Sequence, residues 1–307
     1  MTTEVVATLD HDQIVAWGWR IPFLASVLIM GFAIWVRLSL KESPVFEARE
    51  DVVDGEAVST EKLAEVVDSD TLAQAAKSRK GRSFFAAFFL RFGQAGNSGM
   101  IQTYLISYIT ARLLLAPSVG TNVVIFSSLC GFATVPIVGA LSDKFGRKTM
   151  YIIMSSISLA LVFPMIDMIS TKDINSVFAG YIIVHQSSVL ALASLENLTM
   201  SELFGARNRY TQLALAKELA AIIATGVSPV IAAALVVTMH GSWLPVAIII
   251  AFFTFCTLVA SIVMPEVAGR DLTKLNDSEP GEALFGPFAR RERAKRGLPA
   301  PEEEWRA

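Results

Sequence analysis

Long apolar runs are the feature that most restricts how this chain can fold. About seven runs approach the roughly 20 residues that an α-helix needs to cross a bilayer, and 53% of the 307 residues are hydrophobic. The runs cover residues 20–40, 84–110, 119–141, 150–169, 174–200, 208–238 and 243–264. Backbone N–H and C=O groups inside a bilayer must be hydrogen-bonded within the protein, which an α-helix achieves. The sequence therefore predicts an all-α, polytopic helical membrane protein.

A short basic turn separates two of these runs and indicates their orientation. It reads Gly139-Ala-Leu-Ser-Asp-Lys-Phe-Gly-Arg-Lys148, with three cationic side chains within five residues. Loops rich in Lys and Arg are retained on the cytoplasmic side of a membrane. Most other Lys and Arg lie in 41–83 and 265–307, which the alternation of spans places on the same side. We therefore expect a multi-pass protein of the cytoplasmic membrane with a cytoplasmic C-terminus.

The polar segments divide the chain into five predicted regions. Residues 1–19 are extracytoplasmic, 20–40 form one transmembrane span and 41–83 form a cytoplasmic central loop. Residues 84–264 form a six-helix transmembrane bundle. Residues 265–307 form a polar cytoplasmic tail, which is predicted to be disordered because it has few apolar residues to bury.

Composition and motifs argue against several other classes of function. The net charge is only −2, so nucleic acid is not an expected partner, and the basic block 290–296 has a topological explanation. The sequence has no H-E-x-x-H, no G-x-S-x-G and no Gly-rich phosphate loop with its Lys. We therefore expect no enzyme, no catalytic residues, no metal and no organic cofactor. A receptor or scaffold role stays open, although no feature favours it.

The basic turn also matches a known pattern. Its sequence, G-x-L-S-D-x-F-G-R-K, resembles the loop signature of the major facilitator superfamily of secondary transporters. Further stretches in matching order resemble the metabolite:proton symporter family, which includes porters for proline/betaine, shikimate, citrate and 2-oxoglutarate. These stretches are 17–24 with 41–46, 202–211, 226–229, and 265–266 with 269–272. The resemblance extends over nearly the whole chain.

This resemblance implies the C-terminal six-helix half of the major facilitator fold, together with the preceding sixth span. Carriers of this fold have two halves, and substrate binds between them near the middle of the bilayer. We therefore expect a truncated or split carrier that requires the missing N-terminal half. The implied function is secondary active transport of a small polar metabolite, an organic acid or a zwitterion, by proton symport within a lipid bilayer. The alternative is an inactive truncated remnant.

Four polar or aromatic residues fall on one face of the predicted helix at 84–110. They are Gln94, Asn97, Tyr104 and Tyr108. By resemblance, this span and the span at 174–200 line the central cavity, so the four side chains are candidates for substrate binding. Hydrogen bonding between helices and an interfacial Tyr explain the same stripe equally well.

Ionisable residues within the spans are candidates for proton coupling, because a charge inside a bilayer is costly. His185 and Glu196 share a face of 174–200 and lie roughly 16 Å apart along the helix axis. Lys217 and Glu218 follow about two turns into the next span. A buried Lys requires a carboxylate, so we expect a Glu196–Lys217 ion pair, with Glu218 pointing about 100° away. The simpler interpretation is a hydrogen-bonded His185 and a Glu196 near the membrane surface.

Arg91 lies about two turns into the span at 84–110. Its guanidinium is able to bind a substrate carboxylate. The position near the end of a span instead favours a side chain that extends to the cytoplasmic lipid headgroups.

Four residues of the basic turn have separate predicted roles. Gly139 allows close approach of helices, and Gly146 permits the tight turn. Asp143 either caps the following helix or accepts a hydrogen bond from Arg147. By resemblance, this loop helps to keep one conformation of the carrier closed to the cytoplasm.

Overall fold

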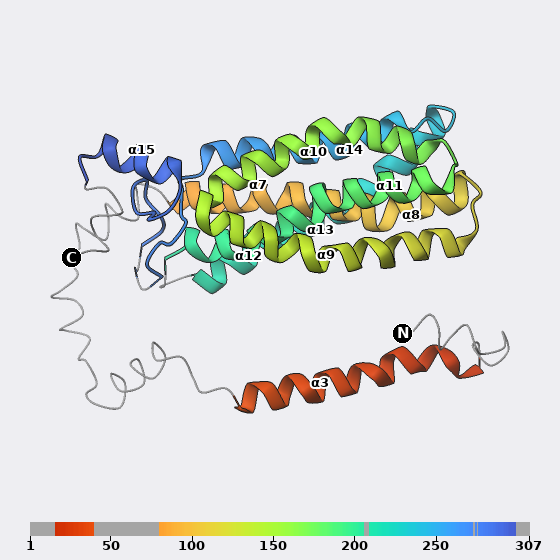
Figure 1. Ribbon diagram of the computed structural model, residues 1–307, viewed down its shortest axis with the longest axis horizontal. Coiled ribbons are helices and arrows are strands. Elements are labelled where there is room, and N and C mark those ends of the chain that lie inside the picture. Colours follow the sequence, from red (N-terminus) through yellow and green to blue (C-terminus); the bar gives the residue numbers. More distant parts are fainter. Residues whose placement is uncertain (1–15, 40–79, 206–208, 273, 275, 299–307) are drawn as a thin grey trace. The chain divides into compact units, whose positions relative to one another are not determined.

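The computed structural model describes residues 16–39, 80–205, 209–272, 274 and 276–298 (Figure 1). These residues form helices and connecting turns, and no strand occurs in these ranges. The all-α architecture expected from the apolar runs is therefore confirmed. The chain divides into two compact units, Met1–Thr71 and Leu72–Ala307, and each is described by itself.

The described part of the first unit is one apolar helix. A single 3₁₀ turn, η1 (Gly18–Arg20), leads into α3 (Ile21–Ser39), which agrees with the predicted span at 20–40. Its large apolar side chains, such as Leu28 and Leu38, are exposed within this unit. The apolar core of the helix, Ser26–Val36, is shorter than the other spans.

Five helical segments of the second unit are long and apolar enough to cross a bilayer. They are α9 (Pro117–Phe145), α10 (Arg147–Ser170), the continuous run of α11 (Ile174–His185), η4 (Gln186–Leu190) and α12 (Ala191–Leu203), then α13 (Arg209–Thr238) and α14 (Leu244–Val263). These helices match the predicted runs from residue 119 onward. The chain thus contains a multi-pass helical membrane unit.

The first helix of this unit is irregular. It consists of α7 (Lys80–Ser98), the π-helical η2 (Gly99–Tyr104), α8 (Leu105–Ser107) and the π-helical η3 (Tyr108–Arg112). Each π turn inserts an extra residue and rotates the side chains that follow it. The regular α-helical face assumed in the sequence prediction therefore does not continue from Asn97 to Tyr108.

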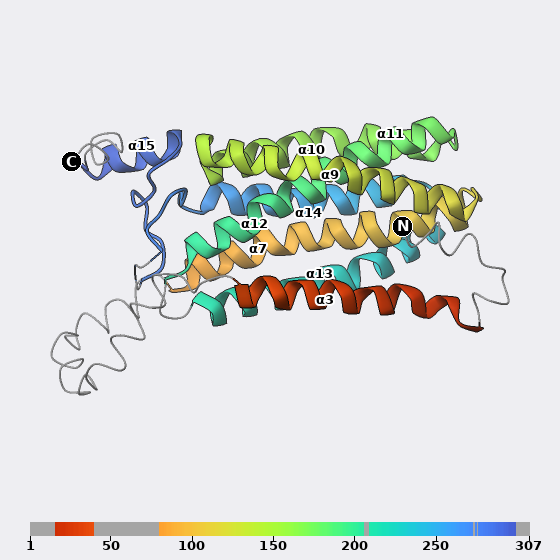
Figure 2. The ribbon, with the colours of Figure 1, turned by 60° about the horizontal axis from the view of Figure 1, so that its bottom comes forward.

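α7 lies between α13 and α14 in the bundle, and α10 packs on α11 and α14 (Figures 1 and 2). The contact between α7 and α14 is close because α7 carries Gly93 and Gly96 there. A Cβ atom at Gly93 would collide with Thr257, and one at Gly96 would collide with the ring of Phe253. Small residues at such crossings are typical of helices that pack within a membrane.

The described residues after α14 are folded, in contrast to the predicted disorder of the tail; residues 273, 275 and 299–307 of that tail lie outside the described residues. Residues 265–298 approach the end of the bundle and include α15 (Pro287–Lys295) (Figure 1). The Ser278 N–H donates to the Leu203 carbonyl at 2.9 Å, and the Leu284 N–H donates to the Ala268 carbonyl at 2.9 Å. Polar composition misled the prediction because this segment is stabilised by charged partners on the bundle and not by a core of its own.

Candidate functional site

The basic turn is a sharp break between two long helices. α9 ends at Phe145, α10 begins at Arg147, and Gly146 between them has φ +92°. Residues that carry a side chain rarely adopt this backbone conformation. A Cβ at Gly146 would also collide with the carboxylate of Glu266, so the turn requires glycine for two reasons.

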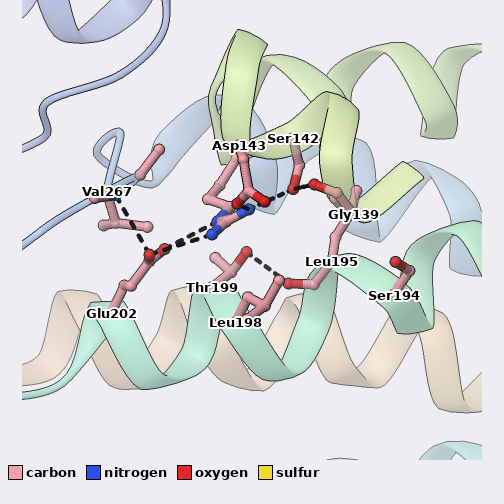
Figure 3. A network of polar contacts seen from close by, with 12 residues as sticks. Gly139, Ser142, Asp143, Ser194, Leu195, Leu198, Thr199, Glu202 and Val267 are labelled. Carbon is pink, nitrogen blue, oxygen red and sulfur yellow. Dashed lines mark hydrogen bonds and ion pairs between the residues drawn. The ribbon is translucent and has the colours of Figure 1, made fainter. Parts of the chain in front are cut away.

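Arg147 joins the turn to a neighbouring helix through a network of charged and polar partners, of which Figure 3 labels Ser142, Asp143 and Glu202. Its Nε donates to Glu202 of α12 at 3.1 Å, and its Nη1 lies 2.6 Å from Asp143 of α9. Nη1 also donates to Ser142, whose hydroxyl donates to the Gly139 carbonyl at 2.7 Å. Arg147 is only 5% exposed. Two carboxylates thus compensate one buried guanidinium, which a buried charge requires.

Glu266 caps the N-terminal end of α10. Its Oε1 accepts from the backbone N–H groups of Arg147 at 2.8 Å and of Lys148 at 3.3 Å, and from those of Val267 and Ala268. A carboxylate is favourable here because the first N–H groups of a helix lack partners and carry partial positive charge. Burial raises the pKa of Glu266 above its ordinary value, although these four N–H groups favour the carboxylate.

The post-α14 segment completes the network. Arg270 donates to the Glu202 carbonyl at 3.0 Å and forms an ion pair with Glu282 at 2.6 Å. The Lys148 ammonium donates to the Met264 carbonyl at 2.7 Å and lies 5.1 Å from the centre of the Phe288 ring. The turn, the end of α12 and residues 264–288 therefore form one interlocked assembly, which we call the turn network.

This geometry corrects the predicted role of Gly139 and decides between the two alternatives for Asp143. A Cβ at Gly139 would have Ser194 as its nearest neighbour at 3.6 Å, an ordinary contact, so no close helix approach depends on Gly139. Asp143 does accept from Arg147, but the cap of α10 comes from Glu266. Sequence reasoning missed both Glu202 and Glu266 as functional candidates, although each lay in a stretch that carried the family resemblance.

The two glycines of the turn give a matched test. We expect Gly146→Ala to lower the apparent melting temperature (Tm) of the purified protein, because alanine must adopt a positive φ and displace Glu266. Gly139→Ala should leave Tm nearly unchanged. Thermal unfolding of both variants in lipid nanodiscs measures this difference, and equal Tm values would contradict the geometry.

A second charged cluster lies within the bundle, where three helices meet. The Glu196 carboxylate of α12 lies 3.0 Å from the Lys217 ammonium of α13, which is the predicted ion pair. It also lies 3.1 Å from Arg91 of α7. Arg91 therefore does not extend to the headgroups, as the sequence had suggested, because a buried carboxylate on the adjacent helix attracts it. The Glu196 side chain is only 3% exposed.

His185 belongs to a buried polar network of its own. Its Nδ1 lies 2.7 Å from the Ser127 hydroxyl of α9, and its Nε2 lies 3.0 Å from the Gln102 side-chain amide of η2. The Gln186 amide donates to the Ser127 carbonyl at 2.6 Å. His185 is 2% exposed. Gln102 lies in the π-helical η2 and Gln186 in the π-helical η4, and sequence periodicity did not predict Gln102 or Ser127.

The residues predicted to line a cavity are not gathered on one open face. Gln94 accepts from Arg91 at 2.7 Å, and Asn97 donates to Thr254 of α14 at 3.0 Å. Both are buried, as is Tyr108, whereas Tyr104 is half-buried and its ring centre lies 6.4 Å from that of Tyr108. Interhelical hydrogen bonding thus accounts for Asn97. Glu218 is exposed and forms no ion pair within the described residues.

The family follows from comparison with known proteins. Residues 2–278 match the family model described as sugar (and other) transporter. The chain belongs to this family. By sequence it is a member of the major facilitator superfamily, and no solved structure matches it significantly.

Curated relatives of this chain agree with the assignment. The putative transporter YdfJ of Escherichia coli K12 is 43% identical over 88% of this chain and 60% of its own length. The E. coli K12 shikimate transporter is 25% identical over 83% of this chain and 56% of its own. The citrate-proton symporter of Klebsiella pneumoniae is 28% identical over 82% of this chain and 54% of its own. The chain thus spans about half to three-fifths of the length of these relatives.

Proposed function

We propose that this transporter chain forms part of a carrier that moves a small polar metabolite together with protons across the cytoplasmic membrane. The observation that carries this proposal is the buried Glu196 carboxylate, which Arg91 and Lys217 approach from two other helices. Ionisable groups within a membrane are costly, and in transporters they commonly serve ion coupling. The names of the shikimate and citrate-proton relatives support a polar solute and protons.

The proposed orientation places the turn network in the cytoplasm. The distribution of Lys and Arg supports this, because the turn and residues 265–298 carry many of them. We infer that the turn network stabilises one conformation of the carrier, because it joins α9, α10, α12 and the segment after α14 through residues 143, 147, 202 and 266. Gly139, Asp143, Gly146 and Arg147 would then act on conformation and not on substrate.

Substrate binding is proposed for the polar residues near the centre of the irregular helix. Gln94 and Tyr104 are the stronger candidates, because Gln94 contacts the charged cluster and Tyr104 is part-exposed. His185 is a second proton-coupling candidate, joined to Gln102 and Ser127. Because carriers of this type bind substrate between two halves, the remaining wall would come from an N-terminal half.

Uptake by proteoliposomes tests the proposal. The chain is reconstituted alone and together with the N-terminal half of E. coli YdfJ, and labelled shikimate, proline and citrate are supplied. We expect accumulation of one of them when an inward proton gradient is imposed, and loss of accumulation after a protonophore is added. Accumulation that survives collapse of the pH gradient and membrane potential would contradict proton symport. No uptake in either preparation would favour the inactive remnant.

A further inference from the structure

The Arg91–Glu196–Lys217 cluster carries more positive than negative charge. Two cations share one carboxylate, and no other acidic side chain of the described residues forms an ion pair with either cation. Tyr151 of α10 is a further titratable side chain near Glu196, and it is buried. An unbalanced cation within a bilayer is unfavourable unless a further anion reaches it.

Both cations are prepared to accept a second anion. The side chains of Arg91 and Lys217 are 25% and 21% exposed, whereas Glu196 is 3% exposed. The Arg91 Nε is buried and has no hydrogen-bond partner within the described residues. Nε and Nη2 together form the edge with which a guanidinium binds a carboxylate through two hydrogen bonds.

Neutral partners hold each cation in place independently of Glu196. Arg91 donates to the Gln94 side chain at 2.7 Å, and Lys217 donates to the Asn197 side chain at 2.8 Å. Gln94 and Asn197 come from the helices that also carry Arg91 and Glu196. Both cations would therefore stay in position when the Glu196 carboxylate is released.

The cluster lies within the helices and not at their ends. Glu196 precedes the end of α12 at Leu203, and Lys217 follows the start of α13 at Arg209. A rise of 1.5 Å per residue puts both roughly 10–12 Å from those helix ends.

We propose that Arg91 and Lys217 bind the carboxylate of an anionic solute, which replaces Glu196 on these two cations. The inference rests on the proposed transport function and names its substrate class: a carboxylate with net negative charge, in preference to a sugar or a zwitterion. The cluster has a net charge of +1 before binding. A solute carboxylate that replaces Glu196 on both cations leaves the Glu196 side chain, which is 3% exposed, as a buried anion without a cation. Such an anion is unfavourable, so Glu196 takes one proton from water, and anion and proton bind together.

Ligand-induced thermal stabilisation of the full chain tests the binding step. The chain is placed in phosphatidylcholine nanodiscs, and Tm is measured with sodium shikimate, sodium citrate, glycine betaine and glucose at equal ionic strength. We expect a Tm increase with at least one carboxylate and none with betaine or glucose. Arg91→Gln and Lys217→Gln should each raise the carboxylate concentration needed for that Tm increase at least about tenfold, since each removes a charge-assisted hydrogen bond. Arg91→Lys should retain part of it.

Three further measurements make the result specific. Lys172→Gln removes an exposed cation in the turn between α10 and α11, and should respond as the wild type does. Glu196→Gln should bind the solute carboxylate at least as tightly as the wild type, because residue 196 then no longer competes for the two cations. If Glu196 had only a structural role, Glu196→Gln would bind the solute more weakly. Replacement of part of the lipid by phosphatidylglycerol distinguishes a headgroup: an equal Tm increase without solute would assign the site to lipid and overturn the proposal.

Three other results would also overturn the anion-site proposal. They are equal Tm responses to betaine, glucose and carboxylates, no Tm response to any carboxylate, and unchanged responses in Arg91→Gln and Lys217→Gln. These outcomes are separate from failure of the transport function. Proton-driven uptake of proline alone would leave the carrier proposal intact and contradict the anion site. Carboxylate binding without uptake in any reconstitution would support the anion site and contradict the carrier proposal.

Discussion

Replacing Glu196 by alanine is expected to lower the stability of the protein by about 3–5 kcal/mol, the cost of leaving a buried charge without its partner. Glu196 is the only carboxylate that pairs with Arg91 and Lys217 among the described residues. Its loss leaves two cations uncompensated. Lys217→Ala should cost less, because Arg91 still neutralises Glu196. Thermal or denaturant unfolding in nanodiscs measures both.

A double-mutant cycle shows whether the two residues act as a pair. Glu196→Ala combined with Lys217→Ala should be more stable than the sum of the single losses predicts, with a coupling energy of roughly 0.5–3 kcal/mol. Glu218→Ala is the matched control, because Glu218 adjoins Lys217 but is exposed. Additive losses in the double mutant, or an equal loss in Glu218→Ala, would show that the ion pair does not stabilise the bundle.

Arg147→Met should produce the second large effect. It leaves Glu202 and Asp143 without their guanidinium partner. We expect it to lower the free energy of unfolding by about 3–5 kcal/mol, because Arg147 is nearly buried. Because the Glu202 carboxylate also accepts from the Gly269 N–H at 3.3 Å, we expect residues 265–298 to become more sensitive to proteolysis. Tm and the rate of limited trypsin cleavage measure the two consequences.

Lys144→Met is the control for this variant. Lys144 lies in the same turn, but it is exposed and its ammonium lies 5.7 Å from the Phe145 ring centre, outside the buried network. Its Tm and cleavage rate should match those of the wild type. If Arg147→Met and Lys144→Met behave alike, the turn network does not hold the post-α14 segment to the bundle.

Helix positions could be predicted from the sequence because apolar runs of bilayer length have few alternatives to an α-helix. The Glu196–Lys217 pair was predictable for a similar reason, since a lysine within a span needs a carboxylate at comparable depth. Arg91 was misjudged because its distance along its own helix says nothing about which neighbour faces it. The contact with Glu196 depends on how α7 and α12 pack, which one sequence does not specify.

The remaining differences have local physical causes. Faces calculated at 100° per residue fail beyond Ser98 because η2, η3 and η4 are π-helical and rotate later side chains. Hence the Gln102–His185–Ser127 contacts were not expected. The segment after α14 was predicted to be disordered because it lacks an apolar core. Its order comes from single charged contacts, such as Arg270 with Glu282 and the Glu202 carbonyl, which composition does not reveal.

The most direct test of proton coupling through Glu196 compares two modes of transport in one variant. In proteoliposomes that carry Glu196→Gln, exchange of labelled for unlabelled carboxylate across the membrane requires no net proton movement, whereas accumulation driven by a proton gradient does. We predict that exchange persists and that gradient-driven accumulation is lost. Accumulation at the wild-type level in Glu196→Gln would contradict the account, because the carboxylate assigned to carry the proton would then be dispensable.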